Sequence, residues 1–275
     1  MRARHTFLWI GLCCVLFAAF SISRAQQNPP PGNDNPADMR VTVPVQELIA
    51  RVDAALRVRD GLYTGKLSAV TKKGDSAVWD FDLYKKDGSS LFQFSSQRRG
   101  LEAKVLYREE GEEIWLWDAL RNQLFRKRDF EKYEGILGTS FSFIDLSGYS
   151  FQASYNGRQA VLLRSENSIF TRLTLLPILE SGYSRLAVLA DQRASYRPIR
   201  IDFHNRDGLL LKAMQFGYDG ELLLKTSGKA GAVDFPARVE CVDLNSGLIS
   251  RLEYFTYDES VVPGDALFDP DFLNR

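Results

Sequence analysis

Cysteine and histidine are both scarce in this chain of 275 residues, which has three cysteines and two histidines. Cys13, Cys14 and His5 lie in its first 14 residues, so only Cys241 and His204 remain for the rest. A lone cysteine cannot form an intramolecular disulfide, and this pair of residues is too small a set for a zinc site or a Cys–His dyad. We expect Cys241 to be a buried small hydrophobe and His204 to lie on the surface.

Enzyme motifs are also missing. No G-x-S-x-G elbow, phosphate loop or dinucleotide fingerprint occurs. Asp80, Asp82 and Asp87 lack the ligand spacing of an EF-hand loop, and the glutamates around Gly111 are typical of a solvated hairpin tip. Hydrolysis by carboxylates alone stays open. We therefore predict a protein that is not an enzyme and uses no cofactor or metal.

The chain has no apolar run long enough to span a bilayer. Residues 7–20 form an apolar run of about 14 residues, whereas a spanning helix needs roughly 20. Arg2 and Arg4 precede this run, and Ser23-Arg24-Ala25 follows it as a small-x-small cleavage site. We predict an export signal over 1–25, cleaved after Ala25; the alternatives are a membrane anchor or lipidation at Cys13, which the preceding leucine fits poorly.

Neither sign of charge is in excess, since 35 basic residues balance 35 acidic ones. The predicted signal holds three arginines and no acid, so its removal leaves a formal charge of −3. Such a protein has no general attraction to nucleic acid or to an anionic membrane. Residues 26–40 are rich in proline and asparagine and predict a disordered leader, which leaves 41–275 as one domain.

One amphipathic helix is predicted at the start of that domain. Pro44 suits a first helical position, and apolar residues then recur at three- and four-residue spacing up to Leu56. Asp60-Gly61 is a stop signal. This helix needs an apolar surface to cover.

The remaining pattern is strand after strand. Apolar and polar residues alternate around Trp79, Phe92 and Trp115, and again in later segments bounded by turn signals such as 86–88, 156–157 and 206–208. The later predicted strands are 158–164, 184–189, 199–203, 209–216, 233–242 and 248–257. We predict a mainly β protein with a single curved antiparallel sheet of about eleven strands.

The apolar face of the predicted sheet is larger than the area that the remaining predicted elements can cover. Only the helix and the glycine-rich segment 129–149, which reads as a loop or short-helix lid, are left to cover it, so an unclosed half-barrel is expected. Large side chains or a bound ligand must fill the remainder. The candidate cavity-lining residues are Leu48, Val52, Trp79, Phe81, Leu83, Phe92, Phe94, Trp115, Trp117, Phe141 and Phe143. For any single one of Trp79, Trp115, Trp117, Phe92 and Phe94 the alternative is an ordinary core position, whereas as a group along consecutive strands they favour a cavity wall.

Four stretches together resemble the outer-membrane lipoprotein-sorting (LolA-like) proteins over residues 45–275. They are the helix running into a glycine-initiated strand (48–67), the strand E-I-W-L-W-D (113–118), the segment L-G-T-S-F-S-F-I-D-L (137–146) and the ending D-A-L-F-D-P-D-F-L (265–273). The third is similar to the family pattern M-G-[ST]-D-F-S-[YF]-x-D-L. It departs from that pattern at Leu137, which replaces Met, and at Ser140, which replaces the first Asp.

The resemblance implies a monomeric periplasmic carrier that shields acyl chains of lipoproteins or other lipids and moves them toward the outer membrane. An inner-membrane exporter and an outer-membrane acceptor are the implied partners. Two alternatives stay open: a lipoprotein- or lipid-sensing regulatory module built on the same half-barrel, and a filled barrel that is only an interaction scaffold. The basic run Arg126-Lys127-Arg128 is either a docking site or an exposed strand end.

Overall fold

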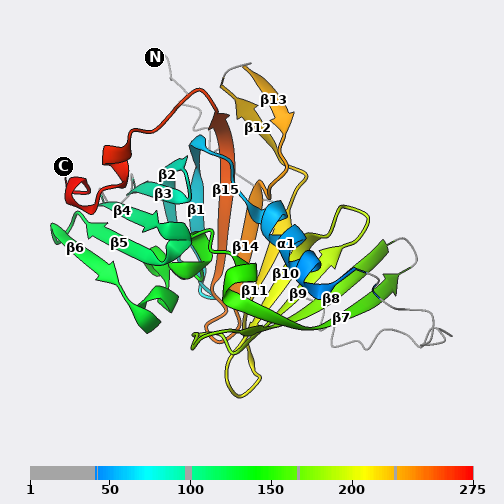
Figure 1. Cartoon of the computed structure of the whole chain (residues 1–275). Coiled ribbons are helices and arrows are strands. Elements are labelled where there is room, and N and C mark those ends of the chain that lie inside the picture. Colours follow the sequence, from blue (N-terminus) through cyan, green and yellow to red (C-terminus); the bar gives the residue numbers. More distant parts are fainter. Residues whose placement is uncertain (1–40, 42, 97–100, 166–167, 226–227, 275) are drawn as a thin grey trace, which may run out of the picture. The chain divides into compact units, whose positions relative to one another are not determined.

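A computed structural model describes residues 41, 43–96, 101–165, 168–225 and 228–274, which fold as the unit Met39–Arg275. The described residues form one sheet of fifteen strands, in the order β6-β5-β4-β3-β2-β1-β15-β14-β11-β10-β9-β8-β7, with β12 and β13 off this path (Figure 1). The predicted export signal (1–25) and leader (26–40) lie outside the described residues.

The strands are β1 (Gly61–Val70), β2 (Ser76–Lys86), β3 (Ser89–Ser96), β4 (Leu101–Arg108), β5 (Glu113–Asp118), β6 (Gln123–Lys127), β7 (Tyr155–Ser165), β8 (Ser168–Pro177), β9 (Arg185–Asp191), β10 (Arg197–His204), β11 (Leu210–Gly217), β12 (Glu221–Leu224), β13 (Lys229–Ala232), β14 (Arg238–Asp243) and β15 (Ile249–Asp258). The helices are α1 (Val45–Leu56) and α2 (Phe151–Ser154), with short 3-10 turns η2 (Glu109–Gly111), η3 (Asp129–Tyr133), η4 (Ile136–Gly138), η5 (Ile144–Leu146), η6 (Asp265–Phe268) and η7 (Pro270–Phe272).

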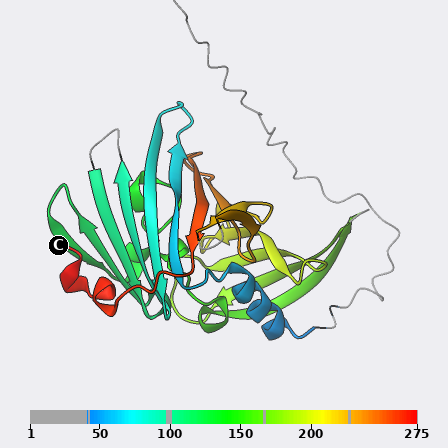
Figure 2. The same cartoon turned by 90° about the horizontal axis from the view of Figure 1, so that it is seen from above.

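The sheet consists of two meanders joined in the middle. Strands β1 to β6 form one and β7 to β11 the other, while β14 and β15 return so that β15 pairs antiparallel with β1 (Figure 2). Strands β6 and β7 are the two ends of the order and do not pair with each other, so the sheet is not closed. The predicted class is confirmed, but the count of about eleven is too low; β8, β12 and β13 all lie outside the strands predicted for the second half of the chain.

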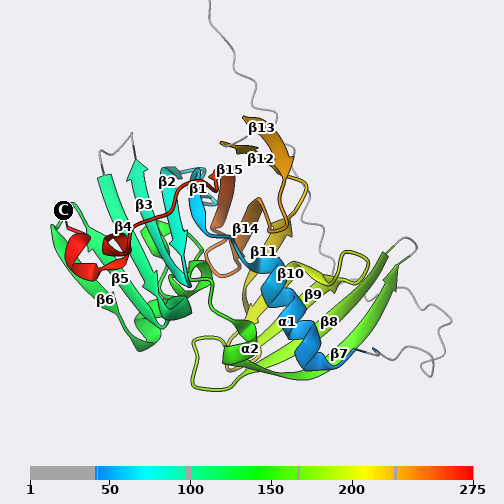
Figure 3. The same cartoon turned by 45° about the horizontal axis from the view of Figure 1, so that its top comes forward.

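Helix α1 is confirmed, and it lies across the β7–β10 half of the sheet (Figure 3). Its buried residues are Leu48, Ile49 and Val52. The helix approaches β7 so closely that a Cβ on Gly157 would lie 2.1 Å from Val45 Cγ1. Asn156-Gly157 is therefore not the predicted turn: it lies inside β7, at an irregularity of the β7–β8 register.

The segment between β6 and β7 runs over the sheet as predicted. It contains η3, η4, η5 and α2, and its one strand-like contact is an isolated bridge between Gly135 and Ser142. We call residues 129–154 the covering segment. Its irregular backbone follows from its glycines, and its buried residues include Ile136, Phe141 and Phe143.

Apolar side chains are buried on both faces of the sheet. The larger cluster packs beneath α1 and the covering segment. A smaller one on the other face contains Leu91, Leu106, Phe268 and Leu273, with Trp115 and Trp117 packed against it. The C-terminal turns η6 and η7 thus cover the outer face of the first meander. Within the described residues, no helix has the length and apolar character needed to cross a bilayer.

Candidate functional site: an apolar cavity with a charged mouth

A cavity of about 520 Å³ lies between the sheet, the end of α1 and the covering segment. This volume is within the roughly 300–1,000 Å³ typical of small-molecule pockets. Both meanders contribute walls. The apolar lining residues are Leu56, Val58, Leu83, Phe92, Phe141, Leu146, Tyr149, Phe151, Ile201, Phe203, Met214, Phe216, Pro236, Val239, Leu252 and Tyr254.

The strand register orders the wall formed by the first meander. Leu83 of β2 lies opposite Phe92 of β3, which gives an apolar row inside the cavity. One step along the same face, Lys85 lies opposite Ser90, and both line the cavity. Ser90 in turn pairs with Tyr107 of β4. A polar row therefore follows directly after an apolar one.

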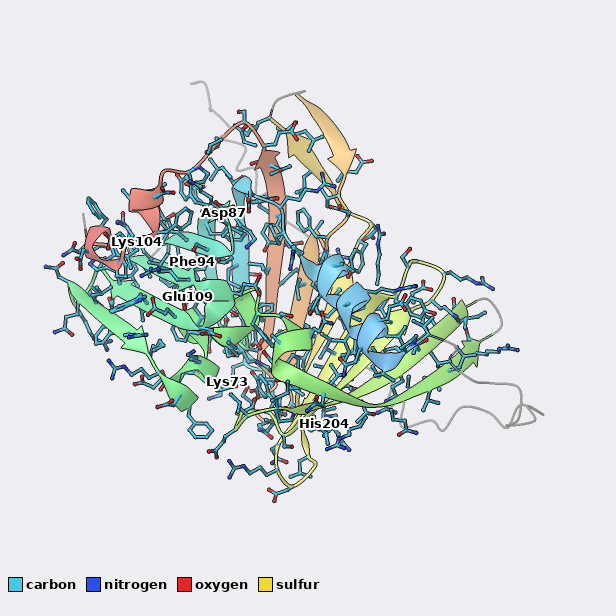
Figure 4. The ribbon with its side chains drawn as sticks, in the orientation of Figure 1. Lys73, Asp87, Phe94, Lys104, Glu109 and His204 are labelled. Atoms are coloured by element: carbon cyan, nitrogen blue, oxygen red, sulfur yellow. The ribbon has the colours of Figure 1, made fainter. Side chains whose placement is uncertain are left out.

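Exposed charged residues mark the mouth of the cavity beyond this polar row. Arg57, Arg59 and Asp60 come from the link between α1 and β1, Asp87 from the β2–β3 turn and Glu110 from η2. The turn and η2 are joined by a hydrogen bond of 3.2 Å from Glu110 N to Gly88 O. Figure 4 labels Asp87 and Glu109 in this region, with His204 at the distant lower end of β10.

Asp53 of α1 anchors the last part of the covering segment. Its carboxylate accepts hydrogen bonds from Ser150 Oγ at 2.7 Å, Phe151 N at 2.8 Å and Gln152 N at 3.0 Å. These backbone donors belong to the first turn of α2, which would otherwise leave them without partners. Asp53 thereby fixes the covering segment where it borders the cavity.

Asp145 anchors its middle through a buried ion pair with Lys212 of β11. The carboxylate also accepts hydrogen bonds from Ser142 N at 2.6 Å and Tyr183 Oη at 3.2 Å. Burial, and then the charge of Asp145, raises the pKa of Tyr183 well above its ordinary value. Tyr183 therefore stays protonated and keeps donating to the carboxylate.

Ser140 anchors the segment to the centre of the sheet. Its Oγ donates to the carbonyl of Cys241 at 2.7 Å, and its backbone N–H donates to Ser250 Oγ at 2.8 Å. Cys241 is fully buried, as predicted. Burial raises the pKa of its thiol to about 12, so the thiol is inert at neutral pH.

The predicted cavity-lining residues divide into three groups. Leu83, Phe92 and Phe141 line the cavity. The second group is buried in the larger core cluster but does not line this cavity; it consists of Leu48, Val52, Trp79, Phe81, Phe94 and Phe143. Trp115 and Trp117 lie against the smaller cluster on the other face, because the residues of β5 that face inward are Ile114 and Leu116.

Sequence reasoning missed most of the wall formed by the second half of the chain, whose members are Ile201, Phe203, Met214, Phe216, Val239, Leu252 and Tyr254. Six of them occur in pairs two residues apart on β10, β11 and β15, and Val239 lies on β14. That alternation is visible in the sequence. The sequence does not show which of the two faces of each strand borders a cavity.

His204 is only 7% exposed, so the prediction of a surface histidine is wrong. Burial lowers the pKa of its imidazole, and so does the positive charge of the nearby Arg185.

The basic run 126–128 forms ion pairs with acidic residues: Arg126 pairs with Glu113 and Lys127 with Glu134, each at 2.7 Å. Across the described residues, no three His, Cys, Asp or Glu side chains gather as a metal site.

Three solved structures share this architecture. A DUF1329 family protein from Desulfovibrio piger has a TM-score of 0.67 and 16% identity, and the match covers 83% of this chain and 97% of that one. A LolA superfamily protein from Nitrosomonas europaea has a TM-score of 0.66 and 19% identity, covering 84% and 100% of the two chains. The fold is LolA-like. A domain from Vibrio parahaemolyticus named for outer membrane lipoprotein sorting matches this LolA-like fold at a TM-score of 0.65 and 18% identity, covering 84% and 98%.

The LolA-like fold confirms the resemblance drawn from the four sequence stretches. No family model matches the sequence, and no curated protein matches it. At this level of identity the structural likeness establishes the fold.

Proposed function

We propose that this protein is a periplasmic carrier that binds acyl chains of lipoproteins or lipids in its cavity and moves them toward the outer membrane. The observation that carries the proposal is the cavity of about 520 Å³, lined by aromatic and aliphatic side chains and bordered by charged residues at its mouth. An apolar interior with a polar rim suits an amphiphile.

The driving force for such binding is burial of the chain. Each methylene removed from water contributes about 0.8 kcal/mol. Ten methylenes would contribute roughly 8 kcal/mol, from which an association cost of about 4 kcal/mol or more is subtracted, so each further buried methylene adds directly to the affinity. Phe92, Phe141 and Phe203 offer flat walls that accept a chain in several conformations.

The predicted export signal over 1–25 supports a periplasmic location, as does the LolA-like neighbour named for lipoprotein sorting. A carrier in that compartment needs a donor and an acceptor, for which we propose an inner-membrane exporter and an outer-membrane receptor. We propose that it acts as a monomer. Release of cargo would require the covering segment to move away from the sheet.

The test is to fill the cavity. Val239 lines it and is 8% exposed, so Val239→Trp places an indole inside. Val78→Trp makes the same change on β2, where Val78 is 41% exposed and lies outside the cavity. With a fluorescent fatty-acyl probe, we expect the Val239 variant to lose binding at least tenfold and the Val78 variant to bind like the wild type. Normal binding by both folded variants would refute the proposal.

A further inference from the structure

Lys85 is a cation that faces an apolar interior. It lies on the cavity face of β2, next to the apolar row of Leu83 and Phe92. Across the described ranges, its ammonium group has neither a hydrogen-bond nor an ion-pair partner. The neighbouring Lys86 points to the opposite face and is paired with Asp265 at 2.6 Å.

Ser90 presents a second polar group at the same level. It is the register partner of Lys85 on β3, is only 4% exposed and lines the cavity. Its hydroxyl too has no hydrogen-bond partner in the described part of the chain. Arg57 lies nearby at the end of α1 and adds a second, exposed cation to the mouth.

This arrangement is costly for the empty protein. Lys85 is half-buried, and this burial disfavours its charged form and lowers its pKa. Asp60 and Glu110 act in the opposite direction, toward the charged form, but both are exposed on the outer rim. Asp60 also accepts a hydrogen bond from the backbone of Asp87 at 3.3 Å. The inner row therefore holds an ammonium group and a hydroxyl but no carboxylate.

We propose that Lys85 and Ser90 bind the anionic head group of an acyl-chain ligand, a carboxylate or a phosphate, while the chain fills the apolar cavity behind them. This inference rests on the proposed function and narrows its cargo class to acidic amphiphiles. The ammonium and the hydroxyl both donate to the anion, and Arg57 adds positive charge at the mouth.

The test uses three ligands with the same palmitoyl chain: palmitate, lysophosphatidic acid and the neutral monopalmitoylglycerol. Titration calorimetry compares the wild type with Lys85→Met and with the control Lys86→Met, which alters the adjacent residue on the other face. We expect Lys85→Met to weaken at least one of the two anionic ligands by about tenfold or more, and to leave the neutral ligand unchanged. Lys86→Met should bind all three like the wild type.

The outcomes separate the two proposals. If Lys85→Met binds both anionic lipids as tightly as the wild type, or weakens the neutral lipid equally, the head-group site is refuted while the acyl cavity stands. If the wild type binds none of the three, the carrier function itself fails. Acetate and inorganic phosphate, which lack a chain, should not bind, and the tighter of the two anionic lipids identifies the head group.

Thermal unfolding provides a second readout. Removing an unpartnered cation should raise the melting temperature of ligand-free Lys85→Met, whereas palmitate should stabilise the wild type more than this variant. A lower melting temperature for ligand-free Lys85→Met would contradict the claim that the cation is held for a ligand.

Discussion

Asp145 and Lys212 form an ion pair whose side chains are 0% and 7% exposed, between the covering segment and β11. The pair joins residues 67 positions apart. Lys212 also lies over the rings of Tyr183 and Phe203, at 4.9 and 5.1 Å from their centroids. Since Phe203 lines the cavity, the same cluster that holds the covering segment down also supports the cavity wall.

Breaking this pair should be more harmful than replacing it. Lys212→Met alone leaves Asp145 buried without its cation, and we expect it to lower the free energy of unfolding by about 3–5 kcal/mol. Lys212→Met combined with Asp145→Leu removes both charges and should recover much of that loss. Urea unfolding of both proteins measures the difference, and a double variant less stable than the single one would contradict this account.

Asp53 should stabilise the covering segment locally. Asp53→Ala removes the acceptor for three donors of residues 150–152 and should cost about 1–2 kcal/mol. Hydrogen exchange at the amides of Phe151 and Gln152 should accelerate. Glu47→Ala, which removes an exposed acid from the same helix, serves as the control and should leave those amides protected. Equal exchange in the two variants would argue against the anchor.

Cys241 should be unreactive in the folded protein. A thiol with a pKa of about 12 is only about one part in 10⁴ thiolate at pH 8, and its burial blocks access as well. We expect a thiol-specific chromogenic reagent to modify Cys241 only as fast as the protein unfolds, and completely in denaturant. Rapid stoichiometric modification of the native protein would show that the centre of the sheet is open.

Binding of an acidic lipid should weaken at alkaline pH. Burial lowers the pKa of Lys85 below its ordinary 10.5, and the free protein therefore loses this cation at a lower pH than a surface lysine does. Affinity for palmitate should fall as the pH rises through that lowered pKa, whereas Lys85→Arg, which stays charged, should hold its affinity over the same range. A fall of equal size in both proteins would assign the effect to another group.

The sequence predicts the architecture better than the cavity. Alternation of apolar residues identifies strands, and the spacing from Val45 to Leu56 identifies the helix, because both periods are properties of the local backbone. Alternation does not say which face of a strand borders a cavity. Trp115 and Trp117 illustrate this, since they face the C-terminal turns, whose position depends on packing of distant residues such as Phe268.

The turn predicted at Asn156-Gly157 is wrong for a related reason. In the sequence, Asn156-Gly157 is a strong turn signal, yet here the glycine gives room for Val45 of α1 to lie against β7. Lys85 differs again: its place in a strand is predictable, but its unpartnered state depends on which charged groups the fold brings to the cavity mouth. Long-range contacts decide these features, so no local pattern reports them.

Native mass spectrometry of the protein purified after export, with its bound molecules extracted and identified, tests the central claim most directly. The account predicts adducts at the masses of lipids or acylated peptides, and these adducts should disappear on delipidation. Adding palmitate should then produce an adduct on the wild type but not on the Val239→Trp variant. A wild-type protein that is bare as purified and takes up no added acyl ligand would contradict it, and the interior would then be a filled core.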